Sequence, residues 1–225
     1  MKPTLVIANK TYSSWSFRPW ILMRHFGIAF DEVVIPLAQE NTRAEILRLS
    51  PAGRCPALHD GEIVVWDSLA IIEYVAERHP NMPIWPRPRA ARAQARSLAA
   101  EMHSGFMGLR GLLPMNMRRK AKKRELTPEA IADVARLEQA FGQARGEFGQ
   151  AGAFLFGDFS AADAMFAPVV SRFHTYRMVV GAPARDYMRA VMNLPAWSTW
   201  TEAAAVEPWV LPEFEIAGAV EPARG

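Results

Sequence analysis

The sequence predicts an α/β domain in the order βαβα-ββα, followed by an all-helical domain. Three observations lead to this prediction. Short apolar runs typical of strands occur only in the first third of the chain. Four prolines then fall within residues 80–88, a density that neither a helix nor a central strand tolerates. From Ala90 onward, segments rich in alanine, arginine and leucine replace the strand patterns. We therefore expect domains at 1–79 and 90–225, with a linker at 80–89.

The first four elements are predicted to alternate between strand and helix. Residues 4–8 form an apolar run typical of a strand, and a serine-rich turn follows it. A helix then extends to Gly27, a typical C-terminal stop. Residues 30–36 predict a second strand and residues 42–49 a short second helix.

Pro19 predicts where the first helix begins. Proline is tolerated in the first turn of a helix, because its missing N–H would have no intrahelical partner there. With Ser16 as the N-cap, Pro19 falls at the third helical position. Ser13 and Ser14 are then expected just ahead of the helix, where unpaired amides and the helix dipole favour a negative sulfur or oxygen.

A hairpin and a third helix complete the α/β domain. Residues 55–59 and 63–66 predict two strands, with Asp60-Gly61 as a two-residue turn. Asp67-Ser68 then opens a helix that follows helical apolar spacing up to His79.

The helical domain is predicted from five apolar segments. They span residues 90–113, 128–148, 161–177, 184–192 and 196–205. Ser160 and Asp163 have the spacing of a capping box, so we expect a structural role for both. The proline-containing end of the chain is predicted to be irregular, with its last residues disordered.

Composition and charge exclude several classes of function. The net charge of +3 is modest and gives no basic face for nucleic acid. A single cysteine, Cys55, allows no intrachain disulfide and suits a reducing compartment such as the cytoplasm. No apolar run is long enough for a membrane span, and the histidines show no metal-ligand spacing, so we assign no metal.

One basic run stands out. Residues 118–124 carry six positive charges in seven residues, which would repel one another in a regular helix. A solvated connection is the favoured interpretation. Binding of an anionic substrate or a weak nucleic-acid contact is the alternative.

Four local motifs, in this order and at these separations, resemble the cytosolic glutathione transferase superfamily over nearly the whole chain. They are Tyr12-Ser13-Ser14-Trp15-Ser16, Cys55-Pro56, Asp67-Ser68 and the segment 157–163. Within the superfamily the chain is similar to the bacterial serine-type, zeta-like branch. The resemblance implies a thioredoxin-like N-terminal domain with a mixed four-stranded sheet, and glutathione as co-substrate.

The resemblance places a serine hydroxyl against the glutathione sulfur. Ser13 is the first candidate for the catalytic donor and Ser14 the second, and Trp15 stands where some relatives carry a cysteine. Only the thiolate is strongly nucleophilic. Lowering a thiol pKa from about 8.5 to about 6.5 requires roughly 2.7 kcal/mol, which one charge-assisted hydrogen bond and a helix dipole supply together.

The other two motifs are implied to hold the rest of the tripeptide. A cis bond before Pro56 turns the backbone of Cys55 so that it pairs strand-fashion with the cysteinyl part of glutathione. Cys55 itself is a small residue rather than a redox centre, because no second cysteine exists to resolve a disulfide. Ser68 and the amides behind it are implied to bind the γ-glutamyl carboxylate, with Asp67 nearby.

The first long helix is implied to lie opposite the sulfur. Its candidates for contact with a second substrate are Met102, His103, Phe106, Met107 and Arg110. They form an adaptable apolar wall with a polar end, or alternatively plain core. Met115 and Trp209 are candidates to close this site.

The resulting hypothesis is a cytoplasmic, homodimeric glutathione transferase that adds the glutathione thiolate to a small apolar electrophile. The enzymatic alternatives are a glutathione-dependent isomerase of the maleylacetoacetate type and a glutathione peroxidase. A non-catalytic, transferase-like binding or regulatory protein is the alternative outside enzymes. The dimer follows from the resemblance alone.

Overall fold

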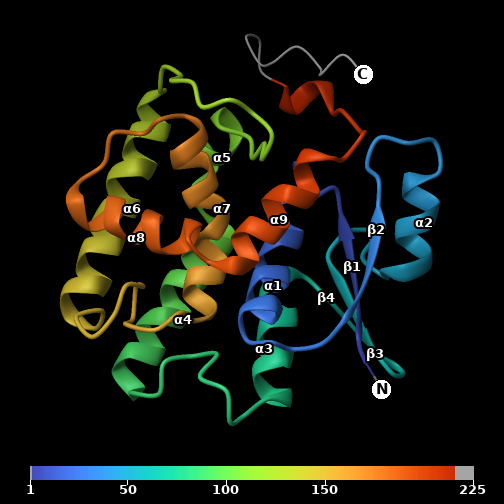
Figure 1. Cartoon of the computed structure of the whole chain (residues 1–225), viewed down its shortest axis with the longest axis horizontal. Helices are drawn as coiled ribbons and strands as arrows, with labels where there is room; N and C mark the ends of the chain where they lie inside the picture. The colour runs from blue at the N-terminus through green and yellow to red at the C-terminus, as the bar shows by residue number, and fades with distance from the viewer. Residues whose placement is uncertain (1, 216–225) are drawn as a thin grey trace.

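A mixed four-stranded sheet forms the N-terminal part of the structure, a computed structural model that describes residues 2–215. The strands are β1 (Thr4–Ala8), β2 (Asp31–Ile35), β3 (Ala57–Asp60) and β4 (Ile63–Trp66), in the order β2-β1-β3-β4. β2 runs parallel to β1, and β3 and β4 run antiparallel to their neighbours (Figure 1). This confirms the predicted sheet. The predicted disorder at the end of the chain lies outside the described residues.

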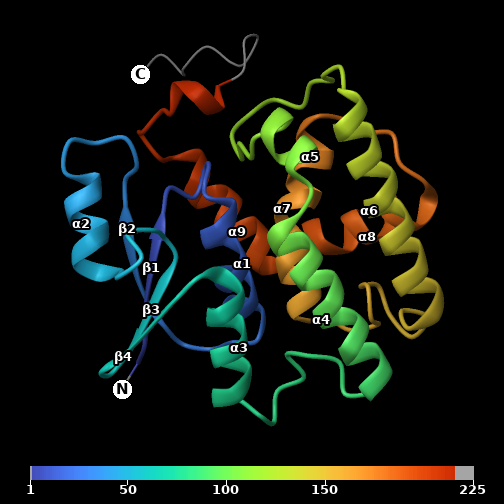
Figure 2. The same ribbon diagram turned by 180° about the vertical axis from the view of Figure 1, so that it is seen from behind.

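Helix α1 (Ser14–His25) joins the sheet to the helical half. It packs against α3 (Ser68–Arg78) on one side and against α7 (Ala161–Thr175) and α9 (Pro195–Ala205) on the other (Figures 1 and 2). Its Phe17 and Trp20 are buried and both contact the ring of Trp200 from α9, with centroids 4.8 and 4.9 Å apart. The first turn of α1 is therefore held from both halves of the molecule.

The predicted start of α1 is wrong by one turn. Ser13, not Ser16, is the N-cap, and its Oγ accepts a hydrogen bond from Ser16 N at 3.3 Å. Pro19 consequently lies inside the helix, where proline removes the bond to the carbonyl four residues earlier. Burial of Phe17 and Trp20 on either side of Pro19 outweighs this loss. Ser14 is thus the first helical residue.

The hairpin forms as predicted, with its turn shifted by one residue. Asp60 pairs with Ile63, so the two loop residues are Gly61 and Glu62. Gly61 has φ +63°, a conformation that glycine adopts without strain. The short helix α2 (Thr42–Leu49) forms as predicted, and its buried Ile46 packs with Val6, Ile35 and Ala57 of the sheet.

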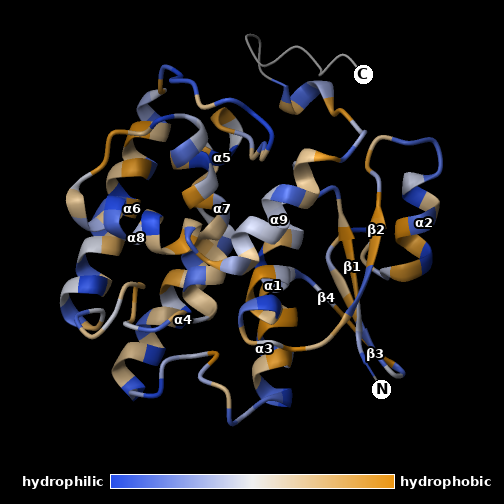
Figure 3. Cartoon of the chain, viewed as in Figure 1, coloured by the Kyte–Doolittle hydropathy of each residue, from blue (hydrophilic) through white to orange (hydrophobic). Residues whose placement is uncertain are grey.

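The second half of the chain is all-helical. Its helices are α4 (Arg89–Ser104), α5 (Met107–Leu112), α6 (Pro128–Glu147), α7 (Ala161–Thr175), α8 (Ala182–Met192) and α9 (Pro195–Ala205), followed by a 3₁₀ turn (Pro212–Phe214). α7 is buried along nearly its whole length and packs against α1, α4 and α8. Figure 3 shows hydrophobic residues concentrated on β1, β2 and the inner helices. The limits of the two domains remain a prediction.

The single helix predicted over residues 90–113 is wrong. The chain breaks at Gly105, and Phe106 adopts a left-handed conformation with φ 59° as the N-cap of α5. Tertiary packing explains the break. A Cβ on Gly108 would lie 2.8 Å from the backbone carbon of Glu129, so α5 must cross closely over the start of α6.

This close approach gives a matched pair of substitutions on one short helix. Gly108→Ala is expected to lower the free energy of unfolding by about 1 to 3 kcal/mol, because the new methyl group overlaps backbone that cannot move freely. Gly111→Ala has nothing within 4 Å of its Cβ and is expected to be neutral or stabilising. Urea unfolding of both variants tests this expectation, and equal effects would contradict it.

The predicted capping box at the start of α7 is confirmed. Asp163 Oδ2 accepts from Ser160 N at 2.8 Å and from the Ser160 hydroxyl at 3.0 Å, and Oδ1 accepts from Leu155 N at 3.1 Å. Asp163 is fully buried. The carboxylate therefore joins the loop before α7 to the helix itself.

Candidate functional site

The register of the strands brings the three N-terminal motifs together at one end of the sheet. Val6 near the end of β1 pairs with Ala57 at the start of β3, and Ala57 pairs with Trp66 at the end of β4. The turn before α1, the Cys55-Pro56 bond and Asp67 therefore all lie at this end of the sheet. In the sequence, Ser13 and Asp67 are more than fifty residues apart.

The three serines of the first motif have different environments. The Ser13 hydroxyl lies 2.8 Å from Ser16 Oγ, and Ser16 Oγ accepts from Ala8 N at 3.0 Å. These bonds attach the start of α1 to the end of β1. Ser14 is 8% exposed, and its hydroxyl has no hydrogen-bond partner among residues 2–215. Of the two predicted catalytic candidates, Ser14 has the hydroxyl that is not committed to holding the helix.

The Cys55-Pro56 peptide bond is cis. The thiol of Cys55 is partly buried, and this burial raises its pKa to about 11. At pH 8 a thiol with this pKa is on the order of 0.1% ionised. The environment of Cys55 thus disfavours the reactive thiolate.

The rate of alkylation directly measures how reactive the Cys55 thiol is. In the folded protein at pH 8, Cys55 is expected to react with iodoacetamide roughly 100-fold more slowly than in urea, because the thiolate is scarce. The fraction of alkylated Cys55 is measured over time by mass spectrometry. Fast labelling of the folded protein would show that the thiol is activated after all.

The start of α3 combines a side-chain cap with an unpaired hydroxyl. Asp67, at φ 78°, accepts from Leu69 N at 2.9 Å and from Ala70 N at 3.3 Å. Ser68 is fully buried, and its Oγ has no hydrogen-bond partner in the described part of the chain. A buried hydroxyl of this kind at a helix N-terminus suits an anionic ligand.

A ring of charged and aromatic groups links the starts of α1 and α3. The Trp15 ring lies 5.2 Å from the His103 ring, and His103 Nε2 lies 3.3 Å from Asp67 Oδ2. The guanidinium carbons of Arg18 and Arg110 lie 4.2 and 4.6 Å from the Trp15 ring centroid. Residues from α1, α3, α4 and α5 thus meet at Trp15.

The predicted wall of the second substrate site does not form as one stripe. The break before α5 separates its members: Met102 and Phe106 are buried in the core, whereas Met107 is 66% exposed. Met115, a candidate to close the site, is also buried in the core. His103 and Arg110 lie beside Trp15 instead.

Sequence reasoning missed Arg18. It is 1% exposed, and its Nε and Nη1 have no hydrogen-bond acceptor. Its signal in the sequence was an arginine within the apolar run from Phe17 to Met23. Burial lowers its pKa well below the usual range, with the nearby positive charges of Arg110 and Arg172 as further causes.

The basic run forms a loop without helix, as predicted, but its first residue is not solvated. Arg118 donates to the hydroxyl of Tyr12 at 2.9 Å and to the carbonyl of Trp209 at 2.8 Å. The Tyr12 hydroxyl in turn donates to Glu215 at 2.6 Å. Arg118 therefore holds the segment after α9 against the residue that precedes Ser13, and this places Trp209 next to the site's outer edge.

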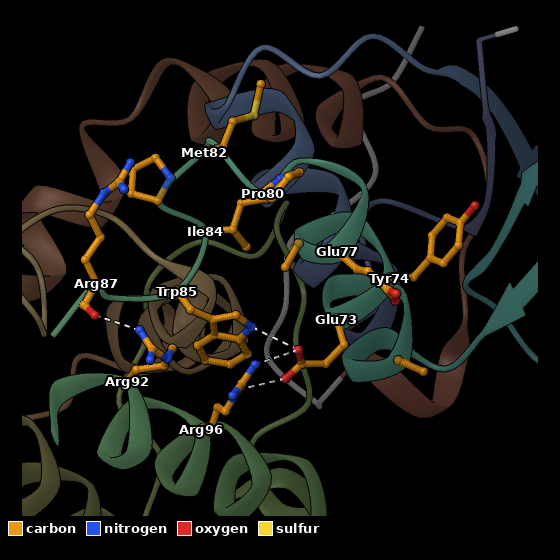
Figure 4. Close-up of a pocket in the computed structure, with 13 residues that line it drawn as sticks. Glu73, Tyr74, Glu77, Pro80, Met82, Ile84, Trp85, Arg87, Arg92 and Arg96 are labelled. Carbon is orange, nitrogen blue, oxygen red and sulfur yellow. Dashed lines mark hydrogen bonds and ion pairs between the residues drawn. The ribbon is translucent and has the colours of Figure 1, made fainter. Parts of the chain in front are cut away.

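A cavity in the structure lies away from these residues. A cavity of about 850 Å³ opens between α3, the proline-rich segment and α4 (Figure 4). Trp85 and Arg96 both contact Glu73 there. None of the predicted site residues lines it.

Two further features are relevant to function. Within residues 2–215, no group of three or more His, Cys, Asp or Glu side chains is placed to hold a metal ion. In the same part of the chain, none of the helices has the length and hydropathy needed to cross a membrane.

Comparisons with known proteins match both halves of the chain. The family described as "Glutathione S-transferase, N-terminal domain" matches residues 12–78, and "Glutathione S-transferase, C-terminal domain" matches residues 118–203. A zeta-class glutathione S-transferase of Euphorbia esula is 34% identical over 116 residues, 51% of this chain and 52% of that protein. A "Probable maleylacetoacetate isomerase" of Caenorhabditis elegans is 28% identical over 53% of this chain and 55% of its own. The chain thus spans about half the length of these relatives.

Two other similarities extend over most of the chain. A "Stringent starvation protein A homolog" of Haemophilus ducreyi is 24% identical over 86% of this chain and 92% of that protein. The crystal structure of a Burkholderia glutathione transferase homolog with bound glutathione superimposes with a TM-score of 0.70. It is 21% identical and covers 91% of this chain and 98% of the other, so it supports the fold.

Proposed function

Because this chain belongs to the glutathione S-transferase superfamily, we propose that it is a glutathione transferase whose thiolate is stabilised by the first turn of α1. The observation that carries the proposal is the convergence of Ser14, the cis Cys55-Pro56 bond and Ser68 at one end of the sheet. Each offers a donor or a backbone edge that suits one part of an anionic tripeptide.

The chemistry follows from these groups. Ser68 Oγ and the amides at the start of α3 would bind the γ-glutamyl carboxylate, which gives the buried hydroxyl its missing partner. Cys55, ahead of the cis bond, would pair through its backbone with the cysteinyl part. The Ser14 hydroxyl would donate to the sulfur, so that the thiolate forms near neutral pH and attacks an electrophile. Trp15 would border the space that the electrophile enters.

The test is glutathione binding by calorimetry, followed by turnover against electrophiles, peroxides and maleyl-type diketo acids. Binding with turnover of electrophiles is the expected result. Turnover of diketo acids alone would instead indicate the isomerase, and turnover of peroxides alone the peroxidase. Glutathione binding without any turnover would favour a binding or regulatory protein. No glutathione binding at millimolar concentration would refute the transferase, and with it the glutathione-dependent isomerase and peroxidase.

Homodimerisation and a cytoplasmic location are further parts of this proposal and rest on the family alone. Light scattering on the purified chain measures the mass directly. A mass of about twice the 25.1 kDa of one chain is expected, and a single-chain mass would contradict the dimer.

A further inference from the structure

The Arg18 side chain is an exception to the rule that buried charges are paired. Nε and Nη1 are sealed from solvent and have no acceptor, and no described carboxylate forms an ion pair with this residue. Burying a cation without a partner is costly, so such groups are normally paired or bind a ligand. Within the described residues, the Arg18 guanidinium therefore has no anion as an ion-pair partner.

The surroundings of Arg18 add positive charge. Arg110 and Arg172 both lie close enough to lower its pKa by repulsion, and among residues 2–215 Asp67 is the one carboxylate that opposes them. Arg110 donates to the carbonyls of His103 and Gly105, and Arg172 to those of Leu113 and Pro168. Carbonyl partners leave the positive charge of a guanidinium uncompensated. The oxygens of Asp67, moreover, already cap α3 and contact His103.

The neighbours of Arg18 reach the surface, and one of them presents a flat aromatic ring. Trp15, His103 and Arg110 are each partly exposed, whereas Arg18 is buried next to them. Both Arg18 and Arg110 lie against the Trp15 ring, at 4.2 and 4.6 Å. His103 Nδ1 is another buried polar atom of this group without a partner. A planar anion entering beside Trp15 would meet unpaired donors from two helices.

We propose that Arg18 and Arg110, together with Trp15, form a carboxylate-binding site in which an acidic group of a bound molecule is held beside the reacting sulfur. A guanidinium presents parallel N–H groups that match the two oxygens of a carboxylate. Arg172 supplies positive potential but is committed to two carbonyls. This inference rests on the proposed function, which identifies the neighbouring groups as a glutathione site. The carboxylate belongs either to the second substrate or to glutathione itself.

The experiment uses two electrophiles with saturating glutathione. Both are the same chlorodinitrobenzene, substituted with a carboxylate in one and with a carboxamide in the other. The wild-type protein is expected to show a KM at least 10-fold lower for the carboxylate. Arg110→Gln, a partly exposed position, is expected to raise that KM about 10-fold and leave the carboxamide KM unchanged. Arg18→Lys should give the same direction of change. Arg24→Gln is the control, because Arg24 also lies over aromatic rings, those of Trp20 and Phe30, but is at the other end of the helix.

The two sources of the carboxylate give different results. If Arg110→Gln raises the KM for glutathione equally with both electrophiles, the site holds a glutathione carboxylate. If only the carboxylated electrophile is affected, the site holds the second substrate. If neither variant differs from Arg24→Gln by more than twofold while glutathione still binds, the carboxylate site is refuted.

A binding measurement separates this inference from the proposed function. Calorimetry of benzoate and benzamide, without glutathione, is expected to show tighter binding of benzoate to the wild-type protein and loss of that preference in Arg110→Gln. This result would support the site even if glutathione does not bind. Equal binding of the two compounds in both proteins, together with normal glutathione binding, would refute the site and leave the transferase proposal standing.

Discussion

Replacing Ser14 with alanine is expected to lower kcat/KM for electrophile conjugation roughly 10- to 100-fold and to raise the pKa of the bound glutathione thiol by about one to two units. The reason is the loss of one hydrogen bond to a charged sulfur, donated by a hydroxyl that has no other partner in the described structure. The thiol pKa is measured from thiolate absorbance as a function of pH, and kcat/KM from initial rates.

Ser13→Ala is the matched control. Its hydroxyl is the N-cap of α1 and bonds to Ser16, so its loss is expected to cost about 1 kcal/mol of stability with little change in the thiol pKa. This reverses the order of the two serines that the sequence suggested. If Ser13→Ala raises the thiol pKa and Ser14→Ala does not, the assignment to Ser14 is wrong.

Replacing Asp163 with alanine is expected to reduce the free energy of unfolding by roughly 3 to 5 kcal/mol and to lower Tm by roughly 10 °C. The substitution removes three accepted hydrogen bonds and leaves the buried amides of Leu155 and Ser160 without partners. Thermal and urea unfolding measure the loss. Asp158→Ala, an exposed neighbour, is expected to stay within about 0.5 kcal/mol, and equal losses would contradict the capping role.

The same carboxyl group gives a pH dependence with a definite sign. Burial raises the pKa of Asp163 from 3.8 to about 6, although its hydrogen bonds act in the opposite direction. The folded protein therefore holds this proton more tightly than the unfolded chain. Stability from Asp163 is present in full below about pH 4 and is lost as pH rises through about 6.

Asp163→Asn, which cannot titrate, isolates this contribution. The stability difference between the wild-type protein and this variant is expected to fall by about 3 kcal/mol between pH 4 and pH 7, since a shift of about two units at 1.36 kcal/mol per unit gives this amount. Urea unfolding across this range measures it. A difference that grows with pH would show that the hydrogen bonds, not burial, dominate.

The sequence determined the order of elements because those signals are local. Short apolar runs, the Asp-Gly turn and the proline cluster act within a few residues, and they located all four strands within two residues of their bounds. The capping box needed only the spacing of Ser160 and Asp163. The cysteine before a cis-proline and the aspartate-serine helix start were likewise readable as motifs.

Tertiary structure alone decided what those motifs do together. The N-cap moved to Ser13 because buried aromatic contacts support α1 around Pro19, and the first long helix broke because Gly108 must approach α6. Arg18 became a site candidate only when the helical half removed it from water beside Arg110 and Trp15. Burial and charge proximity depend on residues far apart in the chain, so local sequence patterns cannot predict them.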